Sequence, residues 1–131
     1  MTTKEFLVLF CESTGQPFEG IFQRGRKEGY LEAEDEIFCG DDITRKNVAR
    51  ILHMYLLKVR HVKDLDMKNA EVLRDLYDCR VCANHVAQMY LRGVMEARDL
   101  LSCGGFLWFD LNGVDTSLEV EDQITRALKI S

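Results

Sequence analysis

Apolar side chains recur every three or four residues over much of the chain, which predicts a mostly helical protein. The clearest apolar stripe occupies five positions on one helix face: Val48, Ile51, Leu52, Tyr55 and Val59. Thr44 stands directly before this helix and is a favourable N-cap residue. The segment from Thr44 to Val59 is therefore the best defined helix of the sequence.

The same pattern predicts further helices at both ends and in the middle of the chain. They are expected over residues 3–13, 17–28, 72–77, 79–92 and from Thr116 onward. The first segment contains six consecutive apolar residues and could also be a buried strand, but Thr3 as a cap and Glu5 in the first turn favour a helix. Pro17 is expected to open the second helix.

Glycines and polar runs mark where these helices end. Gly29 and Gly93 each follow an apolar helix and are expected at helix C-termini, because glycine tolerates the left-handed conformation of a helix end. An acidic loop is expected over residues 32–42, an extended segment over 106–109 and a polar turn over 110–115. Thr116 and Glu119 have capping-box spacing, and Leu118, Ile124 and Leu128 are then expected to face the core.

Composition and charge narrow the class of protein. The 131 residues are 47% hydrophobic and 30% charged, which fits one globular domain over 1–131. The net charge of −5 argues against nucleic acid as a partner, and the apolar run 6–11 is too short for membrane insertion. Five cysteines, an odd number, favour reduced thiols and a cytoplasmic location for the chain as given, whereas a signal peptide removed beforehand would place it at the cell surface.

The order of helix, glycine, loop and threonine-capped helix occurs twice. The first copy covers about 16–59 and the second about 78–131, with a longer loop. In each copy the two helices could bury their apolar stripes against each other. The fold expected is therefore mostly α, with two helix–loop–helix hairpins and an N-terminal helix.

Several short motifs in these copies resemble the S-layer homology module. In the first copy they are Gly29-Tyr30, Asp42-Ile43-Thr44-Arg45, Val48-Ala49 and Ile51-Leu52, and in the second Val81-Cys82, Val86 and Gly93-Val94-Met95. The resemblance covers about two-thirds of the chain. It implies paired helical hairpins and a non-catalytic binding module for anionic, pyruvylated cell-wall polysaccharide.

The sequence also departs from that module. Lys46-Asn47 replaces the usual Ala-Glu after the arginine, Val81-Cys82 replaces Trp-Ala, and Ser117 stands where the second copy would carry its arginine. Two copies are visible, whereas wall-binding members usually use three. A protein-interaction or regulatory module in the cytosol that reuses the scaffold is therefore the alternative function.

Arg45 is the leading candidate for a ligand-binding residue. A cation in the first turn of a helix is disfavoured by the helix dipole, so its placement makes sense if it meets an anion beside the free helix amides. Thr44 would contribute to the same site, and the basic residues of the preceding helix would lie nearby if the two helices pack as a hairpin: Arg24, Arg26 and Lys27. The alternative is an ion pair with Asp41 or Asp42.

The remaining chemistry-bearing residues give weaker signals. Cys79, Cys82 and His85 diverge around one helix and would need help from Cys39, His53 or Cys103 to hold zinc, so unbridged thiols without metal are expected. A redox CxxC is disfavoured because no strand precedes it. The turn after Asp110 lacks calcium-loop spacing, and no phosphate-binding loop or nucleophile signature is present.

Three aromatic residues cluster shortly before the last predicted helix. Phe106, Trp108 and Phe109 are expected to lie mainly in the core, with an exposed surface for sugar or protein as the alternative. No catalytic residue and no cofactor is assigned. The partner expected is an anionic polysaccharide or a protein, and a metal- or thiol-dependent enzyme is the third possibility.

Overall fold

The computed structural model describes residues 1–99 and 106–131 and is mostly helical. Its elements follow one another as α1 (Thr3–Thr14), α2 (Ile21–Glu28), α3 (Ala33–Ile37), α4 (Arg45–Lys58), the 3₁₀ turns η1 (Met67–Ala70) and η2 (Leu76–Asp78), α5 (Ala83–Leu91), β1 (Arg98–Asp99), β2 (Leu107–Trp108) and α6 (Ser117–Leu128). The predicted fold class, mostly α, is therefore confirmed. Pairing of the helices as S-layer-homology-like hairpins stays a prediction.

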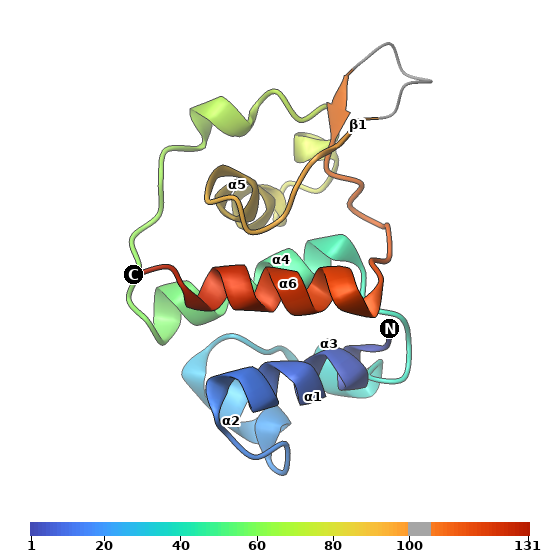
Figure 1. Ribbon diagram of the computed structural model, residues 1–131, viewed down its shortest axis with the longest axis vertical. Coiled ribbons are helices and arrows are strands. Elements are labelled where there is room, and N and C mark those ends of the chain that lie inside the picture. The colour runs from blue at the N-terminus through green and yellow to red at the C-terminus, as the bar shows by residue number, and fades with distance from the viewer. Residues whose placement is uncertain (100–105) are drawn as a thin grey trace.

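The helices lie in three tiers (Figure 1). The middle tier holds α4 and α6 side by side, the lower tier holds α1, α2 and α3, and the upper tier holds α5 with the two 3₁₀ turns. Helix packing crosses the two sequence copies, because α4 packs on both α5 and α6. Helix α1, which precedes the first copy, also packs on α6. One hydrophobic cluster extends from Phe6 to Ala127 and joins the tiers.

Local capping explains where several helices begin and end. Thr116 accepts a hydrogen bond from the amide of Glu119, whose carboxylate accepts the Thr116 amide, so the predicted capping box is confirmed. Gly29 adopts φ 94° at the end of α2, as expected for a glycine cap. The N-terminal segment is a helix, but its capping residue is Thr2 and not Thr3.

Other boundaries differ from the sequence-based expectation. Helix α2 begins at Ile21 instead of Pro17, and the acidic loop contains the short helix α3. The segment 72–77 forms a turn and part of η2 instead of a helix. Helix α5 starts at Ala83, four residues after the expected start at Cys79, and Val81 is 86% exposed. Leu118 is also exposed, whereas Ile124 is buried as predicted.

The aromatic segment is extended, as predicted, but only part of it reaches the core. Leu107 and Trp108 pair antiparallel with Asp99 and Arg98. Phe109 is fully buried, Trp108 is half-buried and Phe106 is exposed. Within the described ranges, no helix combines the length and apolar character needed to cross a lipid bilayer.

A tight approach inside α2 gives a test of this fold. The Gly25 carbonyl accepts bonds from the amides of Gly29, Tyr30 and Leu31, which turns the chain so that Leu31 packs over Gly25. A Cβ atom at Gly25 would lie 2.4 Å from Leu31 Cδ1. Gly25→Ala should lower the free energy of unfolding by about 1–3 kcal/mol in urea titrations, although alanine itself favours helix by about 1 kcal/mol.

Gly40→Ala is the matched control for that substitution. Gly40 has open space within 4 Å of its would-be Cβ, so this variant should stay within about 0.5 kcal/mol of the parent. Equal or greater stability of Gly25→Ala would contradict the packing of Leu31 on α2.

Candidate functional site

Arg45 is an internal residue. Its side chain is 3% exposed, and its guanidinium donates from Nε to the Phe109 carbonyl (2.8 Å), from Nη1 to Asp115 Oδ2 (2.6 Å) and from Nη2 to the Glu96 carbonyl (2.5 Å). The guanidinium carbon also lies 4.7 Å from the centre of the Phe109 ring. All three nitrogens are therefore used within the protein, and the expected alternative of an ion pair with Asp41 or Asp42 is wrong, because the partner is Asp115.

The first amides of α4 are also occupied. The Arg45 amide donates to the Gly113 carbonyl at 2.8 Å, and the Lys46 amide donates to the Leu111 carbonyl at 3.0 Å. Thr44 is the N-cap residue by position, but its hydroxyl makes no capping bond and has no partner in the described part of the chain. The geometry consequently gives no support to an anion site built from Arg45 and Thr44.

The basic residues of α2 lie away from Arg45. Arg24 donates to Gln16 and to the carbonyls of Pro17 and Glu19, within its own segment. Arg26 and Lys27 are exposed in the last turn of α2, in the lower tier of Figure 1. The residues around the Arg45 head come from α6 and the segment 94–98 instead. The predicted cluster of four cations does not assemble.

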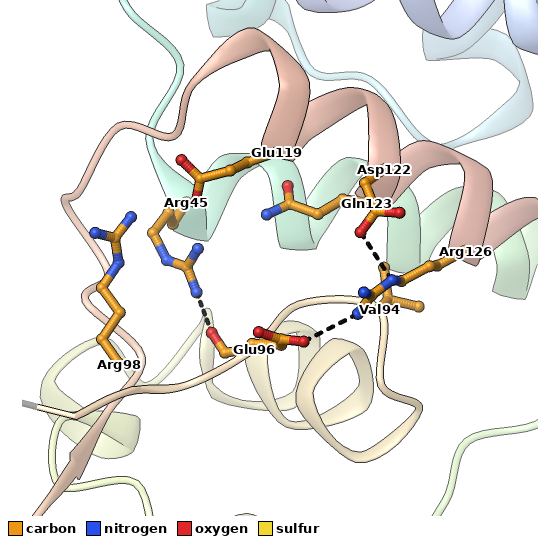
Figure 2. Close-up of a pocket in the computed structure, with 8 residues that line it drawn as sticks. All are labelled: Arg45, Val94, Glu96, Arg98, Glu119, Asp122, Gln123 and Arg126. Carbon is orange, nitrogen blue, oxygen red and sulfur yellow. Dashed lines mark hydrogen bonds and ion pairs between the residues drawn. The ribbon is translucent and has the colours of Figure 1, made fainter.

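A polar cleft does lie beside Arg45 (Figure 2). Its cavity volume is about 210 Å³. One wall is formed by α6 and the facing wall by the chain that follows α5. The lining residues are Arg45, Val94, Glu96, Arg98, Glu119, Asp122, Gln123 and Arg126. Three arginines and three carboxylates therefore surround the cleft, which gives it mixed charge.

The buried carboxylate of Asp115 holds three of the residues that line the cleft. It is 4% exposed and accepts from Arg45, from Gln123 Nε2 at 2.7 Å and from Arg98. Gln123 is 6% exposed, and its amide oxygen Oε1 is buried with no hydrogen-bond partner among the described residues. An unpaired buried acceptor of this kind is costly, and Figure 2 shows the Gln123 side chain reaching from α6 into the cleft.

The cleft entrance carries more exposed charges. Arg126 pairs with Asp122 at 2.8 Å and with Glu96 at 3.3 Å, and its side chain is 42% exposed. The Arg98 side chain is 38% exposed. The Arg126 guanidinium can therefore meet a ligand at modest cost, because half-exposed ion pairs are weak, whereas Arg98 is anchored to the buried Asp115.

A buried polar chain that the sequence did not reveal links α4 to α5. His53 Nε2 lies 2.7 Å from Asp64 Oδ1, and His53 Nδ1 lies 2.8 Å from His85 Nδ1. Asn84 donates to the other oxygen of Asp64. One imidazole must donate and the other accept, so the two rings cannot both be cations in this arrangement. His53, in the middle of this series of hydrogen bonds, is only 4% exposed.

The pKa values of Asp64 and His85, which flank His53, are both shifted. Burial, followed by the charges of His53 and Arg50, lowers the pKa of His85 to about 4, and Asp64 opposes this shift. Burial alone would raise the pKa of Asp64, but hydrogen bonds from His53 and Asn84 outweigh burial and hold that pKa below its ordinary value. Neutral His85 beside ionised Asp64 is therefore the stable combination near neutral pH.

A second buried carboxylate shapes the turn after β2. Asp75 is 4% exposed and accepts the amides of Phe109, Asp110 and Leu111 at 2.8, 2.8 and 3.3 Å. This contact fixes the backbone whose carbonyls then cap α4. The predicted polar turn is thus held by Asp75, a residue that sequence reasoning missed.

The cysteines contradict the expectation of unbridged thiols. Cys79 and Cys82 form a disulfide, whereas Cys11 and Cys39 are free and Cys103 lies outside the described residues. The expectation was wrong because an odd total says nothing about a local pair that one turn brings within bonding distance. Across 1–99 and 106–131, no group of three His, Cys, Asp or Glu side chains is placed to bind a metal ion.

The burial of Arg45 predicts a large effect on folding. Arg45→Met should lower the free energy of unfolding by roughly 3–5 kcal/mol, because breaking a buried pair leaves Asp115 without its principal cation. Arg126→Met, at a half-exposed pair, should cost about 1 kcal/mol or less. Urea unfolding of both variants checks this difference, and equal losses would contradict an internal role for Arg45.

The lowered pKa of His85 predicts acid sensitivity. The unfolded chain binds a proton near pH 6.5 and the folded chain only near pH 4, so stability rises with pH across this window and is lost as pH falls through it. Unfolding measured between pH 4 and 7 should show a loss of roughly 1–3 kcal/mol towards acid. His85→Gln should flatten that slope, and His61→Asn, at an exposed position, should leave it unchanged.

Comparison with known proteins adds no family to this geometry. Protein-family models, curated proteins and solved structures were each compared with the chain, and none matches it. The resemblance to the S-layer homology module therefore stays a prediction. The observed candidate site is a cleft of mixed charge on a mostly α scaffold.

Proposed function

We propose that this chain is a non-catalytic binding module whose ligand occupies the cleft between α6 and the segment 94–98. The observation that carries this proposal is the Gln123 amide oxygen, buried at the cleft and unpaired in the part of the chain that the structure describes. A ligand hydroxyl or N–H group that donates to this oxygen would remove the cost of leaving it unsatisfied.

The chemistry of the cleft favours a saccharide. Arg98 and Arg126 supply donors, while Glu96 and Asp122 supply acceptors on the same rim. Sugar hydroxyls both donate and accept, so they complement a surface of mixed charge. A carboxylate on the sugar would pair with the guanidinium of Arg126 by two parallel bonds, which lysine cannot reproduce.

An acidic cell-wall polysaccharide fits this chemistry and is also what the resemblance to the S-layer homology module implies. The proposal differs from the sequence-based expectation in its residues. Arg98, Gln123 and Arg126 bind, and Arg45 positions Arg98 and Gln123 through Asp115. Attachment at a cell surface follows from this ligand.

A protein-interaction module is the second candidate. It is favoured by two neighbouring apolar residues at the end of α3, Ile37 and Phe38, which are 69% and 55% exposed. Adjacent exposed apolar side chains are typical of a contact surface. This reading predicts partner binding that is independent of the cleft.

Titration calorimetry with a purified, pyruvylated wall polysaccharide tests the proposal. The parent chain should bind with one site per chain, and Arg126→Ala should weaken binding at least about tenfold, equal to about 1.4 kcal/mol. Arg126 is half-exposed, so this variant should fold normally. A glycan without acidic groups should bind the parent more weakly.

Arg26→Ala is the matched control. Arg26 is an exposed arginine of α2 that belongs to the sequence-based site but not to the cleft. It should bind as the parent does. Equal weakening by both variants would indicate non-specific charge attraction, and an absence of binding by the parent at millimolar ligand would leave the protein-interaction reading in front.

A further inference from the structure

The Cys79–Cys82 disulfide lies at the junction of η2 and α5. Cys79 directly follows η2, and Cys82 is the N-cap residue of the nine-residue helix α5. Both cysteines are partly exposed, and Arg80 and Val81 between them are exposed, Val81 to 86%. The turn that carries the disulfide therefore lies at the protein surface.

This disulfide is expected to contribute little to the stability of the fold. A disulfide acts mainly by restricting the unfolded chain, and its effect grows with the length of the loop that it closes. Here only two residues separate the cysteines. The turn is also held by backbone bonds, since the Cys82 amide donates to the Cys79 carbonyl at 3.2 Å and the Ala83 amide to the Arg80 carbonyl at 3.3 Å. The same backbone can therefore hold the reduced pair.

The position of Cys82 favours thiol chemistry. A thiolate at the amino end of a helix is stabilised by the helix dipole and by the free amides of the first turn. The exposed guanidinium of Arg80, two residues earlier, adds positive charge to the same turn. We propose that Cys79 and Cys82 form a thiol–disulfide exchange site, in which Cys82 is the nucleophile and Cys79 resolves the intermediate.

The exchange balances with a disulfide-bearing polypeptide as co-reactant. The Cys82 thiolate attacks one sulfur of the partner's disulfide, which breaks and releases one partner thiolate, and a mixed disulfide forms on Cys82. The Cys79 thiolate then attacks the Cys82 sulfur, forms the 79–82 bond and releases the second partner thiolate. Two electrons pass to the partner, whose thiolates take up the two protons lost by Cys79 and Cys82, and a reducing dithiol restores the pair by the reverse steps.

The surroundings of the pair favour a polypeptide partner over a small polar thiol. A hollow of about 590 Å³ adjoins it, lined by Met67, Tyr77, Arg80, Ala83 and Asn84. Tyr77 and Val81, each within five residues of both cysteines, are 55% and 86% exposed and offer apolar surface to a partner. A peptide disulfide flanked by apolar side chains should therefore react faster than oxidised glutathione.

The first experiment asks whether the pair is exchangeable in the folded chain. The full chain is equilibrated in buffers of reduced and oxidised dithiothreitol at pH 7, alkylated and mapped by mass spectrometry. We expect the 79–82 pair to open and close reversibly with unchanged far-UV circular dichroism. Cys79 and Trp108 both line a second hollow, of about 280 Å³, so the fluorescence of Trp108 should rise on reduction. A pair that opens only when the chain is unfolded by denaturant would overturn the proposal.

The second experiment assigns the two roles. Reduced Cys79→Ser should accumulate a mixed disulfide on Cys82 with a cystine-linked apolar peptide, whereas Cys82→Ser should react about tenfold more slowly at pH 7. Cys39→Ser, which alters a free and partly exposed cysteine elsewhere, should match the parent. Equal rates for the Cys79 and Cys82 variants would overturn the assigned roles, and equal rates with oxidised glutathione would overturn the polypeptide partner.

Discussion

The buried pair of Arg45 and Asp115 is the constraint on which the rest of the structure depends. Arg45 begins α4, Asp115 precedes α6, and the other two bonds of the guanidinium reach the carbonyls of Glu96 and Phe109. Four segments therefore meet at one side chain. A buried charge is tolerated only when it is paired and its remaining donors are satisfied, and the three hydrogen bonds of Arg45 meet that condition.

The same pair explains why the candidate cleft exists. Asp115 accepts from Gln123 and Arg98 as well as from Arg45, so one carboxylate positions both walls. The Gln123 side chain donates from its amide nitrogen to Asp115. Its amide oxygen is buried at the cleft and has no partner among the described residues. The contacts of this ion pair thus leave an unpaired acceptor beside the cleft, while the half-exposed Arg126 at the entrance can exchange partners.

A second group of polar contacts joins the upper tier to the middle tier. Asp75 fixes the turn whose carbonyls cap α4, and His53 connects α4 to His85 on α5. Asp75, Cys79 and Trp108 line the same hollow. Cys79 therefore lies close to the segment 109–113, whose carbonyls accept the first amides of α4. The cleft and the exchange site are chemically distinct, yet both lie against the chain between β2 and α6.

The sequence by itself determined the features that rest on neighbours within about four residues. The stripe of α4, the Thr116–Glu119 capping box and the glycine at the end of α2 follow from helical periodicity, side-chain capping and backbone freedom, which require no distant partner. These local rules also gave the mostly α class and the extended segment before α6.

Only the tertiary structure decided which polar groups meet. Arg45 and Asp115 are separated by 70 residues, and His53 and His85 by 32, so periodicity carries no information about either contact. The unusual cation at the start of α4 was visible in the sequence, but the same signal fits an external anion or an internal carboxylate. Packing favours the carboxylate, because the chain after β2 brings Asp115 and the Phe109 carbonyl to Arg45 and the segment between α5 and β1 adds the Glu96 carbonyl. These bonds are buried, where a hydrogen bond is electrostatically stronger than in water.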